Sequence, residues 1–231
     1  TRKESSAASD VYKRQVRESA EYRAAVDKGD TPDDALKALM DDASFMAKLR
    51  AEKTRVQAGF LAQDPVTGHV LAWVGSRDFA QDPFDHVQAA RRQPGSTFKP
   101  FVYGAAFANG ATPEDTLMDT AVEIPMGGGR VWRPTDGGPP SDQPMTLADG
   151  LAFSKNTITA QVMQQVGPAR VAEVARALGV RQSKLEEVPS LALGTSPVTL
   201  KEMISAYSSI VNLGRYVEPV LITSILSLIH I

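Results

Sequence analysis

Cysteine is absent from this chain of 231 residues and histidine occurs only three times, which removes several kinds of functional site. Without cysteine there is no disulfide framework and no thiolate metal centre, and the absence says nothing about the cellular compartment. His69, His86 and His230 are scattered and lack the spacing of metal ligands, so the sequence implies no metal and no cofactor. A Ser-His-Asp triad is not favoured, although His86 stays open as a candidate base.

Long apolar runs and an excess of one charge are also missing. No run of 18 apolar residues occurs, so the sequence predicts no transmembrane helix, and no secretory signal stands at its start. The formal net charge is -2 and no basic run is present, so we expect no nucleic-acid partner. A content of 42% hydrophobic and 23% charged residues is typical of a globular domain with a sizeable core.

The two ends of the chain differ in character from the rest. Residues 1–15 are polar and lack a helical stripe, and both they and residues 226–231 resemble translated sequencing-adapter read-through. We interpret both as non-native tails; an ordinary arm and an apolar strand end are the alternative. Residues 16–53 are predicted to form a helical linker or subdomain, with a helix beginning at Thr31-Pro32. Residues 54–225 then form the main domain.

The main domain mixes strand and helix patterns, which indicates an α+β fold. Two strands over 56–63 and 69–75 flank an Asp64–Gly68 turn and predict a hairpin. Residues 122–124 and 130–132 predict a second, smaller hairpin, whereas the stretch from 135 to 144 consists of turn residues. Helices are expected over 96–109, 157–166 and 171–178, after a capping box at Thr199, and a last strand over 218–226.

Ser96 and Lys99 stand three residues apart at the start of a predicted helix, just after Pro94-Gly95. That spacing puts both side chains on one face of the helix. A serine hydroxyl needs a base to become a nucleophile, and a buried lysine can be that base because burial lowers its pKa. Pro100 breaks the helical pattern at this point, which is typical of working sites. The alternative is a capping serine beside a solvated lysine.

Ser154-Lys155-Asn156 lies between two predicted helices and offers a second candidate group. A serine and an amide two residues apart on a turn can pass a proton and hold an extended peptide. By itself this pattern is equally typical of an ordinary helix cap.

Together these two groups resemble the penicillin-recognising serine acyltransferases, and wider strings narrow the match to class A (bifunctional) penicillin-binding proteins. The resemblance runs from about residue 54 to 225 and implies a penicillin-binding-protein/serine β-lactamase-like α+β fold, with an antiparallel sheet packed against helices. The matching strings are Ala90–Tyr103, Asp64-Pro65-x-Thr67-Gly68, Val74–Phe79 and Leu193–Val198.

The resemblance also implies the chemistry, a D,D-transpeptidation that cross-links peptidoglycan stem peptides. Ser96 would attack the penultimate D-alanine carbonyl, with its backbone N–H as one oxyanion donor, and Lys99 would take the serine proton. Ser154 would relay that proton to the leaving amine, and Asn156 would hold the peptide donor. Thr195 and Ser196 would bind substrate. An amine of a second stem peptide would resolve the acyl-enzyme, and β-lactams would trap it.

One signature of the resembling family, Lys-(Ser/Thr)-Gly, does not occur in the chain. We therefore expect the domain to be incomplete at its C-terminus and poorly active. The resemblance further implies an upstream glycosyltransferase domain and a membrane anchor, and so an extracytoplasmic location at the periplasmic face of the inner membrane. Three alternatives stay open: a D,D-carboxypeptidase or β-lactamase of the same fold, a β-lactam-binding sensor or pseudoenzyme, and a structural module whose two motifs are only caps.

Overall fold

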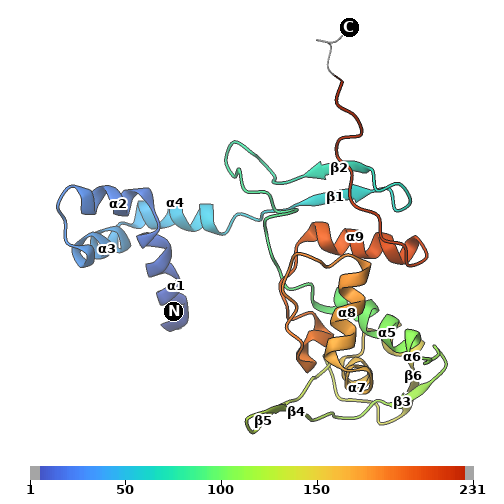
Figure 1. Cartoon of the computed structure of the whole chain (residues 1–231). Coiled ribbons are helices and arrows are strands. Elements are labelled where there is room, and N and C mark those ends of the chain that lie inside the picture. The colour runs from blue at the N-terminus through green and yellow to red at the C-terminus, as the bar shows by residue number, and fades with distance from the viewer. Residues whose placement is uncertain (1–5, 227–231) are drawn as a thin grey trace. The chain divides into compact units, whose positions relative to one another are not determined.

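The structure is a computed structural model that describes residues 6–226. The chain divides into two compact units, residues 1–56 and residues 57–231. Each unit is described by itself below, and the label of each element is the one shown in Figure 1.

Within the described part of the first unit, helices follow one another with short connections. Thr31 caps α3 by accepting a hydrogen bond from the Asp34 N–H, with Pro32 in the first turn, as the sequence predicts. Val16, Leu36 and Leu49 are buried together in a small apolar core. The helices are α1 (Ser6–Arg17), α2 (Ala20–Asp27), α3 (Pro32–Asp41) and α4 (Ala43–Lys53).

The sequence of residues 1–15 shows no helical stripe by inspection, yet its described part is helical. α1 begins at Ser6, and Val16 near its end is buried against Leu36 and Leu49 of this unit. Burial of one side of α1 stabilises it, because most helix stability in proteins comes from a buried face. The origin of residues 1–15 stays a prediction, and residues 1–5 and 227–231 lie outside the described residues.

The second unit begins with the predicted hairpin, which is confirmed. Strands β1 (Phe60–Gln63) and β2 (Val70–Val74) pair antiparallel, with Phe60 opposite Val74. The Asp64 carboxylate accepts hydrogen bonds from the Val66 and Thr67 N–H groups and so fixes the turn between the strands. The predicted strand over 218–226 is wrong, because only Val220 joins this hairpin, through two backbone hydrogen bonds to Gly68 and Val70.

A helical core forms most of the rest of this unit and is built around the apolar helix α5 (Figure 1). Phe101, Val102 and Tyr103 of α5 are fully buried, and α5 lies against α7 and α8. A helix that is apolar on most sides belongs in the centre of a domain. The elements are the 3₁₀ turn η1 (Gly95–Phe98), α5 (Lys99–Ala108), α6 (Leu147–Ala152), α7 (Asn156–Val166), α8 (Pro168–Leu178), the 3₁₀ turn η2 (Pro189–Leu193) and α9 (Leu200–Val211).

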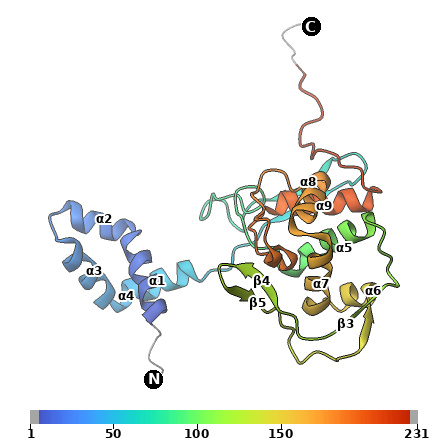
Figure 2. The same cartoon turned by 60° about the horizontal axis from the view of Figure 1, so that its bottom comes forward.

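Two further small sheets occur between α5 and α6. β4 (Ile124–Gly127) and β5 (Arg130–Trp132) form the predicted second hairpin. β3 (Thr116–Met118) pairs with β6 (Pro144–Thr146), a pairing that the turn-rich composition concealed. β6 leads directly into α6, and α6 into the start of α7 (Figure 2). The predicted α+β class is confirmed, with antiparallel two-stranded sheets in the described residues.

Candidate active site

The segment that carries Ser96 and Lys99 is a 3₁₀ turn followed by a helix, where the sequence predicted a single helix. Gly95 has a positive φ of 61° and opens the turn. The Lys99 N–H donates to the Ser96 carbonyl, so the two residues are one 3₁₀ turn apart, a spacing at which side chains eclipse. Pro100 stands in the first turn of α5, where a helix does not use the N–H that proline lacks.

Lys99 is fully buried, and its amine is surrounded by oxygen atoms of the turn between α6 and α7. Nζ donates to the Ser154 carbonyl, to Ser154 Oγ at 3.0 Å and to Asn156 Oδ1 at 2.7 Å. Burial lowers the pKa of Lys99, and the nearby Asp136 carboxylate opposes that shift in part. The structure thus brings Lys99, Ser154 and Asn156 together, although they are 55 and 57 residues apart in the chain.

Ser96 is exposed at the start of the same turn. Over residues 6–226, no hydrogen bond joins its hydroxyl to the Lys99 amine or to another side chain. An ammonium group has three N–H donors, and the three contacts of Lys99 use all of them. A neutral amine would donate only two and could accept a proton from a hydroxyl, so loss of one proton from Lys99 changes this arrangement.

Ser154 has the left-handed backbone conformation, with φ at 55°. This conformation costs a residue other than glycine on the order of 1–3 kcal/mol, and such strain is concentrated at functional sites. Backbone hydrogen bonds hold the turn on both sides of the serine, from Ser154 N to Leu151 O at 3.0 Å and from Lys155 N to Gly150 O at 2.8 Å. The strained turn aims the carbonyl and the hydroxyl of Ser154 at the same amine.

Two carboxylates that the sequence analysis missed hold this turn from the loop between β3 and β6. Asp136 Oδ1 accepts from the Asn156 N–H at 2.7 Å, and Asn156 Nδ2 donates to the Thr135 carbonyl at 2.8 Å. Lys155 Nζ lies 2.8 Å from Asp119 Oδ2 and 3.3 Å from Asp136 Oδ2. The one available signal was the irregular, turn-rich loop itself, because such loops inside compact domains are usually functional.

Asp119 is fully buried and accepts hydrogen bonds at both of its oxygens. Thr157 Oγ1 donates to it at 2.6 Å, and the Ser141 N–H and hydroxyl each donate at 3.0 Å. Burial by itself raises the pKa of this carboxyl, but the bonds from Lys155, Thr157 and Ser141 outweigh burial and hold its pKa well below the ordinary value. Asp119 is therefore an ionised internal anchor.

The residues predicted to bind substrate after η2 have different surroundings. Thr195 is partly buried beside the nucleophile segment, and its carbonyl accepts from Gln93 Nε2 at 2.9 Å. Ser196 is buried, and its hydroxyl accepts from the Glu186 N–H at 2.9 Å. In this conformation the Ser196 hydroxyl therefore supports the loop that carries Glu186 and does not face solvent.

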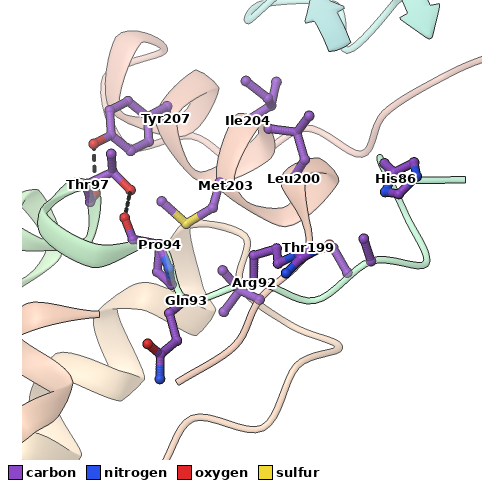
Figure 3. A pocket seen from close by; sticks show the side chains of 12 residues that line it. His86, Arg92, Gln93, Pro94, Thr97, Thr199, Leu200, Met203, Ile204 and Tyr207 are labelled. Carbon is purple, nitrogen blue, oxygen red and sulfur yellow. Dashed lines mark hydrogen bonds between the residues drawn. The ribbon is translucent and has the colours of Figure 1, made fainter. Parts of the chain in front are cut away.

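An apolar pocket of about 480 Å³ lies between Pro94, in the segment before Ser96, and α9 (Figure 3). Tyr207 of α9 donates its hydroxyl proton to the Thr97 carbonyl at 2.7 Å, and Thr97 Oγ1 donates to the Pro94 carbonyl at 2.7 Å. Met203, Leu200 and Ile204 of α9 form much of its wall. Ser96, Lys99, Ser154 and Asn156 do not line this pocket, so it is separate from the polar cluster.

A buried lysine held by a Ser-x-Asn turn, one turn after an exposed serine, defines the serine acyltransferase type of site within an α+β fold. Residues 58–230 match the family model described as "Penicillin binding protein transpeptidase domain". The chain belongs to that family.

Relatives and solved structures agree with this assignment. The chain is 37% identical to penicillin-binding protein 2D of Bacillus subtilis over 172 residues, which is 74% of this chain and 25% of that protein. It is 38% identical to penicillin-binding protein 1A of Rickettsia conorii over 165 residues, 71% of this chain and 21% of that protein. The crystal structure of penicillin-binding protein 1A from Haemophilus influenzae superposes with a TM-score of 0.63 at 31% identity, covering 66% of this chain and 23% of that one.

A more distant structure supports the fold alone. PonA1 of Mycobacterium tuberculosis, solved in complex with penicillin V, has a TM-score of 0.62 at 23% identity and covers 75% of this chain and 49% of that one. The chain thus spans a quarter or less of the length of the first two relatives. No helix in the described residues is both long and apolar enough to span a bilayer.

Proposed function

We propose that this chain is a D,D-transpeptidase domain that forms a serine acyl-enzyme with peptidoglycan stem peptides and with β-lactams. Ser96 Oγ bonds to the carbonyl carbon of the penultimate D-alanine, the peptide C–N bond breaks, and the terminal D-alanine leaves as an amine. The serine proton passes through Lys99 and Ser154 to that amine. An amine of a neighbouring stem peptide then attacks the ester and returns Ser96 as a hydroxyl.

The observation that carries this proposal is the burial of the Lys99 amine against Ser154 and Asn156. Desolvation favours the neutral amine, which can accept a proton, while the Ser154 hydroxyl at 3.0 Å offers a path for that proton to leave. Asn156 has its oxygen on Lys99 and its Nδ2 on Thr135. One Nδ2 hydrogen and one oxygen lone pair remain for a bound peptide. Thr195, beside Gln93, is a further substrate contact in this proposal.

We expect acylation of this chain to be slow. The tripeptide Lys-(Ser/Thr)-Gly, which the family uses to supply a second oxyanion donor, does not occur among its 231 residues. Loss of one oxyanion donor costs about 10²–10³-fold in rate. We further propose that the whole protein carries a glycosyltransferase domain and a membrane anchor and works at the extracytoplasmic face of the inner membrane, as its class A relatives suggest.

Intact-mass spectrometry after prolonged incubation with benzylpenicillin tests the proposal. Opening of the β-lactam ring releases no leaving group, so one adduct of the full mass of the drug is expected. Peptide mapping should place it on Ser96, and Ser96→Ala should take up none. Ser44→Ala in the first unit is the matched control and should react like the unsubstituted chain. An adduct elsewhere, or no adduct in the unsubstituted chain, would contradict the proposal.

A second candidate function is a β-lactam-binding sensor or pseudoenzyme. It is favoured by the engagement of the Lys99 amine with the turn and by the absence of a hydrogen bond to Ser96 within residues 6–226. Stable acylation at Ser96 without transfer to an amine acceptor would support it. Release of a cross-linked product from a D-Ala-D-Ala peptide and an amine would support the transpeptidase. Hydrolysis to the free acid would indicate a carboxypeptidase or β-lactamase.

A further inference from the structure

The N-terminus of α7 lacks a side-chain cap from its own sequence. Lys155 occupies the capping position, and its side chain makes no capping hydrogen bond to the helix. The first helical N–H, that of Asn156, instead donates to Asp136 Oδ1 at 2.7 Å, from a residue 20 positions earlier. Thr157 in the next position donates its hydroxyl to Asp119 and, at 3.3 Å, to Asp136. The β3–β6 loop therefore supplies one capping carboxylate, Asp136, and a second carboxylate, Asp119, that holds the side chain of Thr157.

The same two carboxylates hold the middle residue of the Ser-x-Asn turn. Lys155 Nζ bridges Asp119 at 2.8 Å and Asp136 at 3.3 Å, and its side chain is 18% exposed. The hydrogen bond from Lys155 to the fully buried Asp119 raises the pKa of Lys155, so this ammonium stays charged. The two ion pairs of Lys155 therefore hold the middle of the turn in place. Ser154 and Asn156, the residues on either side of Lys155, both contact Lys99 Nζ.

We propose that Asp136, together with Asp119 and the bridging Lys155, is a positioning residue that holds Ser154 and Asn156 around the Lys99 amine. This inference rests on the proposed function, because it assigns Asp136 a part in preparing the base of that reaction. Asp136 acts in two separable ways. Its oxygen caps Asn156, which fixes the turn, and its negative charge lies near the Lys99 ammonium.

The two contributions predict opposite results for two substitutions. Asp136→Asn keeps an oxygen acceptor for the Asn156 N–H and removes the charge, so the turn should persist while the pKa of Lys99 falls further. Asp136→Ala removes acceptor and charge together, so the turn should loosen as well. Around Lys99 the charged groups of this cluster are Asp136, Asp119 and Lys155, and only the charge of Asp136 changes in the first variant.

The first measurement needs no acylation. Titration of the Lys99 side-chain NMR signal should give a lower pKa in Asp136→Asn than in the unsubstituted chain. Amide hydrogen exchange at Asn156 should be fast in Asp136→Ala and protected in Asp136→Asn. Glu123→Gln on the same loop is the matched control, since Glu123 is 62% exposed and pairs only with Arg133 among the contacts described. It should change neither quantity.

The second measurement is the rate of Ser96 acylation by benzylpenicillin. Asp136→Ala should lose on the order of 10²-fold, the size of effect expected for a misplaced catalytic geometry. Asp136→Asn should keep most of the rate, with its pH profile moved to lower pH. If Asp136→Ala does not fold, the Lys99 titration in Asp136→Asn still decides.

An unchanged Lys99 pKa in Asp136→Asn, or wild-type Asn156 protection in a folded Asp136→Ala, would overturn the inference. Failure of the unsubstituted chain to acylate would instead count against the proposed function and leave these NMR results to decide the positioning role. The two failures are thereby distinguishable.

Discussion

Gly194, at the end of η2, lies directly against Gly95, the residue before Ser96. A Cβ at position 194 would lie 2.3 Å from the Gly95 carbonyl oxygen and 2.6 Å from its nitrogen, and Gly194 has a φ of 65°. Both the contact with backbone atoms and the left-handed conformation require glycine here. The segment that carries the nucleophile and the segment that precedes Thr195 therefore meet backbone to backbone at these two glycines.

Gly194→Ala is predicted to destabilise the domain and to slow acylation of Ser96. The left-handed conformation alone costs about 1–2 kcal/mol with a side chain present, and the backbone clash adds to that. Gly104→Ala is the matched control. A Cβ added at this position of α5 meets nothing within 4 Å, and Gly104 does not have a positive φ. It should stabilise the helix by about 0.5–1 kcal/mol. Urea unfolding gives the free energy of unfolding of both variants. Equal values for Gly194→Ala and Gly104→Ala would contradict the prediction.

Substitution of Ser154 separates its strain from its chemistry. Ser154→Ala and Ser154→Gly both remove the hydroxyl that contacts Lys99, so both should lose acylation. Glycine adopts the observed φ of 55° without the cost that alanine has, so the glycine variant should be the more stable of the two. A difference of about 1–2 kcal/mol in the free energy of unfolding is expected. An alanine variant as stable as the glycine variant would mean that the turn is unstrained.

Glu202 should make the stability of the second unit sensitive to acid. It is buried, and its carboxylate accepts from the Gln182 and Ser183 N–H groups at 2.6 Å and 2.8 Å and from Thr199 in a capping box. Burial alone raises its pKa, but the hydrogen bonds from Ser183, Thr199 and Gln182 lower it below the ordinary value. A carboxyl group whose pKa is lower in the folded than in the unfolded state stabilises the folded protein at pH values above its unfolded-state pKa. That stabilisation is lost as the pH falls through the folded-state pKa.

Glu202→Gln is therefore predicted to reduce stability near neutral pH by about 1–3 kcal/mol, because an amide NH₂ would face backbone donors. Below the ordinary glutamate pKa of about 4.3, the free energy of unfolding of the unsubstituted chain should fall toward that of the variant. The exposed Glu173→Gln is the control and should behave as the unsubstituted chain. Thermal unfolding followed across acidic pH measures the difference. Parallel curves for Glu202→Gln and the unsubstituted chain would contradict the prediction.

Acylation should depend on pH through Lys99. The base must be neutral to accept a proton, so the rate should rise with pH through the Lys99 pKa, which burial holds below the ordinary lysine value of about 10.4. Lys99→Arg should lose acylation at every pH, because a guanidinium stays protonated. The rate of labelling by a fluorescent penicillin, measured in samples quenched at successive times at each pH, gives the pH profile of acylation. Retention of the wild-type profile by the arginine variant would exclude Lys99 as the base.

The local signals in the sequence predicted the local structure. The capping box at Thr199, the Thr31-Pro32 helix start and the Asp64–Gly68 turn each depend on residues within a few positions, and each is confirmed. The gathering of Lys99 with Ser154 and Asn156 followed from the resemblance, since no short-range pattern joins residues so far apart.

What the sequence did not predict depends on distant pairings. Asp119 and Asp136 are single acids in a loop without periodicity, and their partners Lys155 and Thr157 are about 20 to 40 residues away. The strand expected over 218–226 has strand-forming residues, but only Val220 pairs with the hairpin among the described residues. Amino-acid composition indicates which residues favour an extended strand, whereas pairing also requires a neighbouring strand in the folded structure.

The borrowed cap of α7 has a consequence for the order of folding. A helix start that depends on Asp119 and Asp136 cannot be completed by its own segment, so a peptide covering only residues 147–166 should fray at Asn156. Closure of the long loop must come first, with the entropy loss that this entails. We therefore expect the turn around Lys99 to form late in the folding of the domain.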